Sequence, residues 1–148
     1  MTSVFTRDYA VRFGEIDHAG VMYYPALFDR IHKAFEDFWP EALGKTYAEV
    51  LGDDGIGFPL IDTKTTFSAP FRFGDTMRVA IDVVRIGTRS VTFRVRLGAT
   101  GDERLRAEAR MVNAVIAMES FRPVPLPAAY AEALGPYLVD PHVVESPA

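Results

Sequence analysis

The order in which two hydrophobic periodicities follow one another most constrains the fold of this chain. Between residues 26 and 39 apolar side chains recur at three- and four-residue steps, which predicts an amphipathic helix of several turns. After residue 57 the period shortens to two, over residues 76–86, 90–97 and 105–118, with turn residues between these segments. One long helix followed by turn-joined strands predicts an antiparallel sheet with the helix covering one face.

Shorter patterns predict the remaining elements and boundaries. Tyr9, Val11 and Phe13 alternate with Ala10 and Arg12 and predict a first strand with one buried face. Pro25 is expected as the first residue of the long helix, and Pro40 at its end or just beyond it. Further segments are a short helix around residues 47–51, a strand over 63–67 and a C-terminal helix over 128–134.

The chain of 148 residues is long enough for one domain with a hydrophobic core. Residues 1–138 are expected to form that single α+β domain. Residues 139–148 have no periodicity and are expected to form a C-terminal tail.

Composition excludes several classes of function. The absence of cysteine excludes disulfides and a thiol nucleophile, and three histidines without a paired spacing make no metal site (His18, His32 and His142). The net charge of −4 argues against general nucleic-acid binding. No signal peptide or membrane-length apolar stretch is evident, so the cytoplasm is the expected location, with no membrane partner. No metal or other cofactor is expected.

Asp17 is the carboxylate whose position first suggests chemistry. It lies between the first strand and the long helix, and Gly20 follows three residues later. An Asp ahead of a Gly commonly does no more than hydrogen-bond its own backbone in a turn. A carboxylate just before a helix N-terminus also suits hydrolysis, because the free N–H groups there polarise a carbonyl oxygen.

The segment 11–25, VRFGEIDHAGVMYYP, resembles the signature of the 4-hydroxybenzoyl-CoA thioesterase family. The shared pattern is a strand end, an Asp, a small residue, a Gly, two apolar residues, an aromatic residue and then the helix. The layout over residues 6–134 resembles the hotdog fold of that family, an antiparallel sheet of about five strands wrapped around one long helix. The resemblance implies an acyl-CoA thioesterase that releases a free acid and CoA, with an aromatic or short-chain acyl group.

The resemblance also implies catalytic roles. Asp17 would act on the thioester carbonyl as nucleophile or as general base for water, and the backbone N–H of Tyr24 would polarise the carbonyl. His18 departs from the family pattern, and it is either an additional acid/base group or a turn residue. In a related hotdog family the carboxylate lies within the long helix, where Asp29 and Glu36 are the matching candidates here.

Two groups of residues are expected to bind the substrate. Arginines and a serine near the predicted turn at Gly87 and after the last strand would meet the CoA phosphates: Arg85, Arg89, Ser90 and Arg122. Each of these residues could instead be a solvated residue at a strand end. The strand face that carries Arg94 and Arg96 is expected to be solvated or to face another subunit. Aromatic and apolar residues would enclose the acyl group, although a core role explains them equally well: Tyr23, Phe58, Pro59 and Phe67.

The resemblance further implies a homodimer or homotetramer with active sites between subunits. Two other functions fit the same fold. One is a dehydratase or hydratase acting on acyl-CoA or acyl carrier protein, which requires a histidine positioned for proton transfer. The other is a non-catalytic acyl-binding domain.

Overall fold

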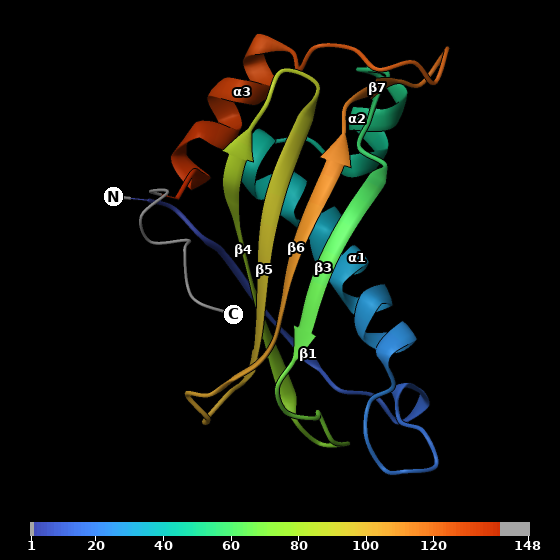
Figure 1. Ribbon diagram of the computed structural model, residues 1–148, viewed down its shortest axis with the longest axis vertical. Coiled ribbons are helices and arrows are strands. Elements are labelled where there is room, and N and C mark those ends of the chain that lie inside the picture. Colours follow the sequence, from blue (N-terminus) through green and yellow to red (C-terminus); the bar gives the residue numbers. More distant parts are fainter. Residues whose placement is uncertain (1, 140–148) are drawn as a thin grey trace.

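The computed structural model describes residues 2–139, which form a five-stranded antiparallel sheet curved around one long helix, α1 (Figure 1). This arrangement confirms the predicted α+β architecture. In chain order the elements are β1 (Phe5–Ala10), the 3-10 turn η1 (Phe13–Glu15), α1 (Tyr24–Leu43), α2 (Tyr47–Gly52), β2 (Ile56–Gly57), β3 (Leu60–Phe67), β4 (Thr76–Ile86), β5 (Ser90–Ala99), β6 (Leu105–Ala114), β7 (Ile116–Ala117), α3 (Ala128–Leu134) and the 3-10 turn η2 (Gly135–Tyr137).

The sheet has the strand order β1-β4-β5-β6-β3, and all its neighbours are antiparallel. Ala10 at the end of β1 pairs with Thr76 at the start of β4, and Phe67 ends β3 beside β6. These strand ends lie at the same end of the molecule as the start of α1, the lower end in Figure 1. β3 forms one edge of the sheet, and seven of its eight residues are exposed.

The core lies between the inner sheet face and α1. Alternate residues of β4 and β5 are buried, as period-two patterning requires, and they meet Leu27, Ile31, Phe35 and Phe38 of the helix. The Phe35 ring lies 5.3 Å from that of Phe93 in an edge-on contact. Full burial of each large apolar side chain contributes roughly 1.5–3 kcal/mol.

The first strand is shorter than expected. β1 ends at Ala10, and Phe13 lies in η1 with 78% of its surface exposed. Its ring contacts Phe73 edge-on at 5.7 Å instead of joining the core. The prediction of a buried Phe13 was wrong because β1 ends three residues earlier, at Ala10.

Pro40 does not end α1, which begins at Tyr24, one residue before Pro25, and continues to Leu43. A proline inside a helix removes one backbone hydrogen bond, here the one to the Glu36 carbonyl. The helix continues because its apolar face stays buried through Trp39. It ends at Gly44, whose φ of 74° suits a glycine cap and whose N–H donates to the Pro40 carbonyl at 3.0 Å.

The C-terminal part of the domain differs from expectation in two places. The last long segment divides into β6 and β7, and β7 pairs with β2 in a separate two-stranded sheet. Val139, assigned to the tail, is buried, and its N–H donates to the Val83 carbonyl of β4 at 2.8 Å. The rest of the predicted tail, residues 140–148, lies outside the described residues. None of the helices within residues 2–139 combines the length and apolar character needed to cross a membrane.

Candidate active site

Asp17 lies on an exposed tight turn between β1 and α1. Ile16 and Met22 form an antiparallel bridge, and the Asp17 N–H donates to the Val21 carbonyl at 3.0 Å. Gly20 closes the turn with a φ of 83°, a conformation that favours glycine. The loop is attached to the body of the protein by the Met22 N–H, which donates to the Phe71 carbonyl at 2.8 Å.

The Asp17 carboxylate combines the two roles that the sequence leaves open. Its Oδ1 accepts a hydrogen bond from the Ala19 N–H at 2.8 Å, which is the turn-forming contact. Within residues 2–139 its Oδ2 has no hydrogen-bond partner, so this oxygen is available to a substrate or a water molecule. His18 is exposed on the same turn.

The start of α1 presents one open amide. Pro25 has no N–H, and the N–H groups of Ala26 and Leu27 both donate to the Tyr23 carbonyl, at 3.0 and 3.2 Å. The N–H of Tyr24, the first helical residue, has no acceptor among the described residues. It is therefore the amide at this helix end that is free to polarise a carbonyl oxygen, and the helix dipole adds to its effect.

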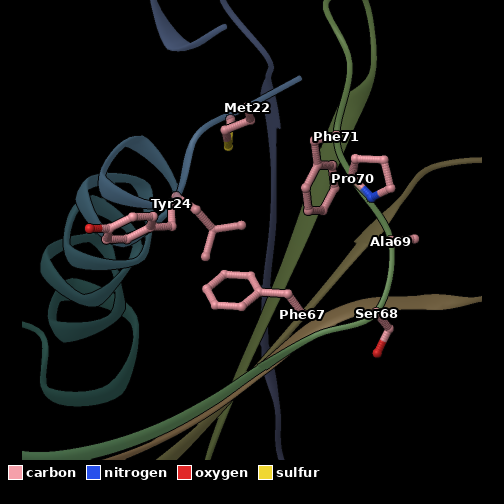
Figure 2. A pocket seen from close by; sticks show the side chains of 8 residues that line it. Met22, Tyr24, Phe67, Ser68, Ala69, Pro70 and Phe71 are labelled. Atoms are coloured by element: carbon pink, nitrogen blue, oxygen red, sulfur yellow. The ribbon is translucent and has the colours of Figure 1, made fainter. Parts of the chain in front are cut away.

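A pocket of about 380 Å³ lies between the start of α1 and the segment that leads from β3 to β4 (Figure 2). Its lining is mostly apolar: Met22, Tyr24, Leu27, Phe67, Ser68, Ala69, Pro70 and Phe71. In Figure 2 the Phe67 and Phe71 rings face the space beside α1, whereas Ser68 and Ala69 point away from it. The ring of Phe28 contacts both Tyr24 and Phe67 edge-on, at 6.5 and 6.2 Å, and so joins the two walls.

A polar network holds the Asp17 loop against α1. Glu15, two residues before Asp17, accepts a hydrogen bond from Arg30 of the helix at 2.9 Å, and both side chains are largely buried. The Arg30 guanidinium lies over the Tyr9 ring, and the Tyr9 hydroxyl donates to Asp37 at 2.6 Å. Burial and this hydrogen bond raise the pKa of Tyr9, so the hydroxyl remains a donor.

The two alternative carboxylates on α1 lie away from the pocket lining. Asp29 is exposed and pairs with Lys33 at 2.7 Å, and this hydrogen bond lowers the pKa of Asp29. Glu36 is also exposed, 3.9 Å from His32. Within residues 2–139 no cluster of three or more potential ligands for a metal ion occurs.

The residues expected around the acyl group do not all lie at this pocket. Phe67 lines the pocket, but Tyr23 lines a different hollow on the other side of the helix start. Phe58 is a buried core residue stacked on Trp39, with ring centroids 4.7 Å apart. Phe58 and Pro59 precede β3, which runs toward the start of α1, so both lie at the far end of the helix.

The residues assigned to the CoA phosphates also lie at that far end. Arg85 and Arg89 flank the β4–β5 turn, and Ser90 pairs with Ala114 at the end of β6. Arg85, Arg89 and Arg122 are all exposed. β4 has 11 residues between this turn and the end that holds the Asp17 loop, a separation of roughly 30 Å. One chain alone therefore does not bring Arg89 and Asp17 together.

Arg94 and Arg96 of β5 differ in their burial. Arg94 is buried and binds Asp82 through two hydrogen bonds, at 3.0 and 2.6 Å, so the expectation of a solvated side chain was wrong for it. Arg96 reaches the same carboxylate at 3.2 Å and is more exposed.

The sequence did not predict that residues 68–71 form a wall of the pocket. These residues follow a strand and include Pro70, which correctly marks a break in the sheet. No periodicity indicates that this break folds beside the start of α1, since the contact depends on strand order. The Pro70-Phe71 pair next to a strand end is the one local signal that could have suggested it.

Proteins with known structures share this architecture. A thioesterase-superfamily protein from Jannaschia sp. superposes with a TM-score of 0.86, at 22% identity, over 93% of this chain and 95% of that one. A 4-hydroxybenzoyl-CoA thioesterase solved with 4-hydroxybenzoyl-CoA superposes with a TM-score of 0.82, at 20% identity, over 88% and 98%. These likenesses place the chain in the class of hotdog-fold proteins.

Sequence comparison gives the family within that class. The model of the thioesterase-like superfamily matches residues 11–134. A 1,4-dihydroxy-2-naphthoyl-CoA hydrolase from Thermosynechococcus vestitus is 30% identical over 123 residues, which cover 82% of this chain and 83% of that protein. The chain belongs to the thioesterase-like superfamily, and the predictions of a hotdog fold and of a thioesterase are confirmed.

Proposed function

We propose that this chain hydrolyses the thioester of an aromatic acyl-CoA at the start of α1. The observation that carries the proposal is the open Tyr24 amide, which lies beside an apolar pocket and directly follows the Asp17 loop. An amide donor at a pocket and a carboxylate in the loop that leads into it are the two kinds of group that suit thioester hydrolysis.

In the proposed reaction the thioester carbonyl oxygen accepts a hydrogen bond from the Tyr24 N–H. Asp17 either activates a water molecule or attacks the carbonyl carbon and forms a mixed anhydride that water then cleaves. In both routes the carbon–sulfur bond breaks and CoA leaves as the thiolate. In the first route water supplies the new oxygen of the acid, and in the second its oxygen enters the acid or the Asp17 carboxylate, according to which anhydride carbonyl it attacks. The thiolate is a good leaving group, so the reaction needs no metal.

The pocket favours an aromatic acyl group. The rings of Phe67 and Phe71 and the side chain of Leu27 provide flat and apolar surfaces, and edge-on or offset contacts between rings are favourable. The relative from Thermosynechococcus vestitus acts on a bicyclic aromatic acyl-CoA. We therefore expect aromatic substrates to be preferred over short aliphatic ones.

A panel of acyl-CoA thioesters tests this proposal. The rate of free thiol release is measured for benzoyl-, 4-hydroxybenzoyl-, phenylacetyl-, 1,4-dihydroxy-2-naphthoyl-, butyryl- and octanoyl-CoA. We expect kcat/KM to be at least about tenfold higher for the best aromatic thioester than for butyryl-CoA. Hydrolysis of none of them would contradict the proposal and favour an acyl-binding or dehydratase function.

We also propose that the CoA phosphates are bound by a second copy of the chain. β3 is an exposed edge strand, and such an edge is a template for pairing with another strand. Antiparallel pairing of two β3 edges around a two-fold axis places the end of one β3 beside the start of the other. Ser90 of β5 and Leu60 at the start of β3 pair with adjacent residues of β6, Ala114 and Asn113, so Arg89 lies near the start of β3. Pairing of the two β3 edges therefore brings the partner subunit's Arg89 toward the pocket beside Tyr24.

Mixing two inactive variants tests the shared site. Asp17→Asn and the double variant Arg85→Ala/Arg89→Ala each impair every site of a homodimer. A mixed dimer then has one site with both defects and one site with none, so about half of the wild-type activity per mixed dimer is expected to return. Each variant mixed with itself is the control. If no activity returns although mixed dimers form, Asp17 and Arg89 do not serve one site across the interface.

A further inference from the structure

Arg106 lies directly behind the pocket wall formed by residues 68–71. It is in β6, next to Ala107, which pairs with Phe67 at the end of β3. Its backbone carbonyl accepts hydrogen bonds from the N–H groups of Ser68 and Ala69, at 2.8 and 3.1 Å. The main chain of Arg106 thus fixes the first half of the wall.

The Arg106 side chain holds the second half. Its Nη1 donates to the Pro70 carbonyl at 2.6 Å and to Asp75 at 3.2 Å, and its Nη2 donates to Asp102 at 3.2 Å. Its guanidinium carbon lies 5.4 Å from the centroid of the Phe71 ring. Only 13% of the side chain is exposed, so these contacts occur largely away from water.

Such a set of contacts requires a guanidinium. Its planar fork reaches the carbonyl and both carboxylates while its face covers an aromatic ring, whereas an ammonium group is a point donor. Hydrogen bonds from Arg104 and, to a smaller extent, Arg106 lower the pKa of Asp102, so that this partner stays charged. Arg106 Nε is buried without a hydrogen-bond partner among the described residues, which is a cost in stability. Arg106 therefore acts mainly by fixing the positions of Pro70, Phe71 and Asp75, and less by stabilising the fold.

We propose that Arg106 is a positioning residue that sets the shape of the acyl pocket and thereby its selectivity. It does not line the pocket, and it acts through Pro70 and Phe71, which do. Without the guanidinium, residues 70–75 lose the hydrogen bonds that connect them to β6 and, through Arg106, to Asp102. The Phe71 ring also loses its contact with the guanidinium. An aromatic acyl group needs that ring in place, whereas a short aliphatic group does not. This inference rests on the proposed function.

The test compares Arg106→Met with Arg104→Met. Methionine keeps the apolar stem of the side chain but no donor. Arg104 is the matched control, because it also binds Asp102 but is 76% exposed and makes no hydrogen bond to the segment from 70 to 75. We expect the ratio of kcat/KM for the best aromatic thioester to that for butyryl-CoA to fall about tenfold in Arg106→Met, mainly through KM. Arg104→Met should keep the wild-type ratio, and Arg106→Lys should lie between them.

A second readout does not depend on activity. Amide hydrogen exchange in residues 68–75 should become faster in Arg106→Met, while exchange in α3 stays as in wild type. An equal loss of kcat/KM for all thioesters, or unchanged exchange in residues 68–75, would overturn the inference. A wild-type protein that hydrolyses nothing refutes the proposed function, and the exchange measurement still decides the role of Arg106. If Arg106→Met does not fold, Arg106→Lys provides both measurements.

Discussion

Asp17→Asn is expected to lower kcat/KM for the best thioester by a factor of about 10²–10⁴, the range that a positioned general base contributes. The amide cannot accept the proton of an attacking water, and it is a poor nucleophile. KM should change little, because the pocket and the Tyr24 amide remain intact. The measurement is the rate of thiol release, with the fold checked by circular dichroism.

The structure makes asparagine the appropriate replacement. Asp17 Oδ1 accepts the Ala19 N–H that closes the turn, and the Oδ1 of asparagine accepts the same hydrogen bond. The turn is therefore kept while the negative charge is removed. Asp17→Ala removes both, so a much larger effect of alanine on stability than of asparagine would reveal the contribution of the turn.

Asp29→Asn is the matched control, since it removes an exposed carboxylate from the first turns of the same helix. It should retain nearly full activity. If Asp17→Asn stays within about threefold of wild type while Asp29→Asn or Glu36→Gln is inactive, the catalytic carboxylate lies within α1.

A single turnover in water enriched in oxygen-18 detects the nucleophilic role of Asp17 when water attacks the Asp17 carbonyl of the anhydride. If a water activated by the carboxylate attacks the thioester, the label appears only in the released acid. If Asp17 forms an anhydride and water attacks the Asp17 carbonyl, the label appears in the protein. Mass spectrometry of the peptide that contains Asp17 detects the difference.

Sequence reasoning succeeded where the signal is local. The 3.6-residue periodicity predicts α1, and alternation predicts β4 and β5 closely, because both patterns record which side of one element faces the core. The position of Asp17 in a turn just before a helix is also local, and the structure places it there. Its catalytic role is not local information and stays a prediction.

Sequence reasoning failed where tertiary contacts decide. Phe58 and Phe67 were both expected beside the acyl group, yet Phe58 precedes the start of β3 and Phe67 ends that strand. Pro40 predicts a helix end, but the buried aromatic face of α1 outweighs the loss of one hydrogen bond. The pocket wall at Pro70 and Phe71 depends on the strand order, which no short segment encodes.

Trp39→Ala is expected to have the largest effect on stability, a loss of about 3–5 kcal/mol in the free energy of unfolding. Trp39 is fully buried at the far end of α1, and its ring meets six other aromatic rings: Phe35, Phe38, Tyr47, Phe58, Phe93 and Tyr130. Alanine leaves a cavity among rings held by α1, α2, α3 and β5, which cannot all collapse into it. The midpoint of thermal unfolding should fall by roughly 10 °C.

Trp39→Phe separates packing from polarity. The indole Nε1 is buried without an acceptor among the described residues, so phenylalanine removes an unpaired donor while it keeps most of the apolar volume. It should therefore cost much less than alanine. Phe121→Ala is the surface control, because this ring is 69% exposed and its loss should change stability little.

The same variants test whether the core and the active site are independent. Trp39 lies about 22 Å along the helix from Tyr24 at about 1.5 Å per residue, and it does not line the pocket. Well below its unfolding midpoint, Trp39→Ala should therefore keep a kcat within about threefold of wild type. A large loss of kcat in a folded Trp39→Ala protein would show that packing at the far end of α1 controls the helix start, and with it the Tyr24 amide.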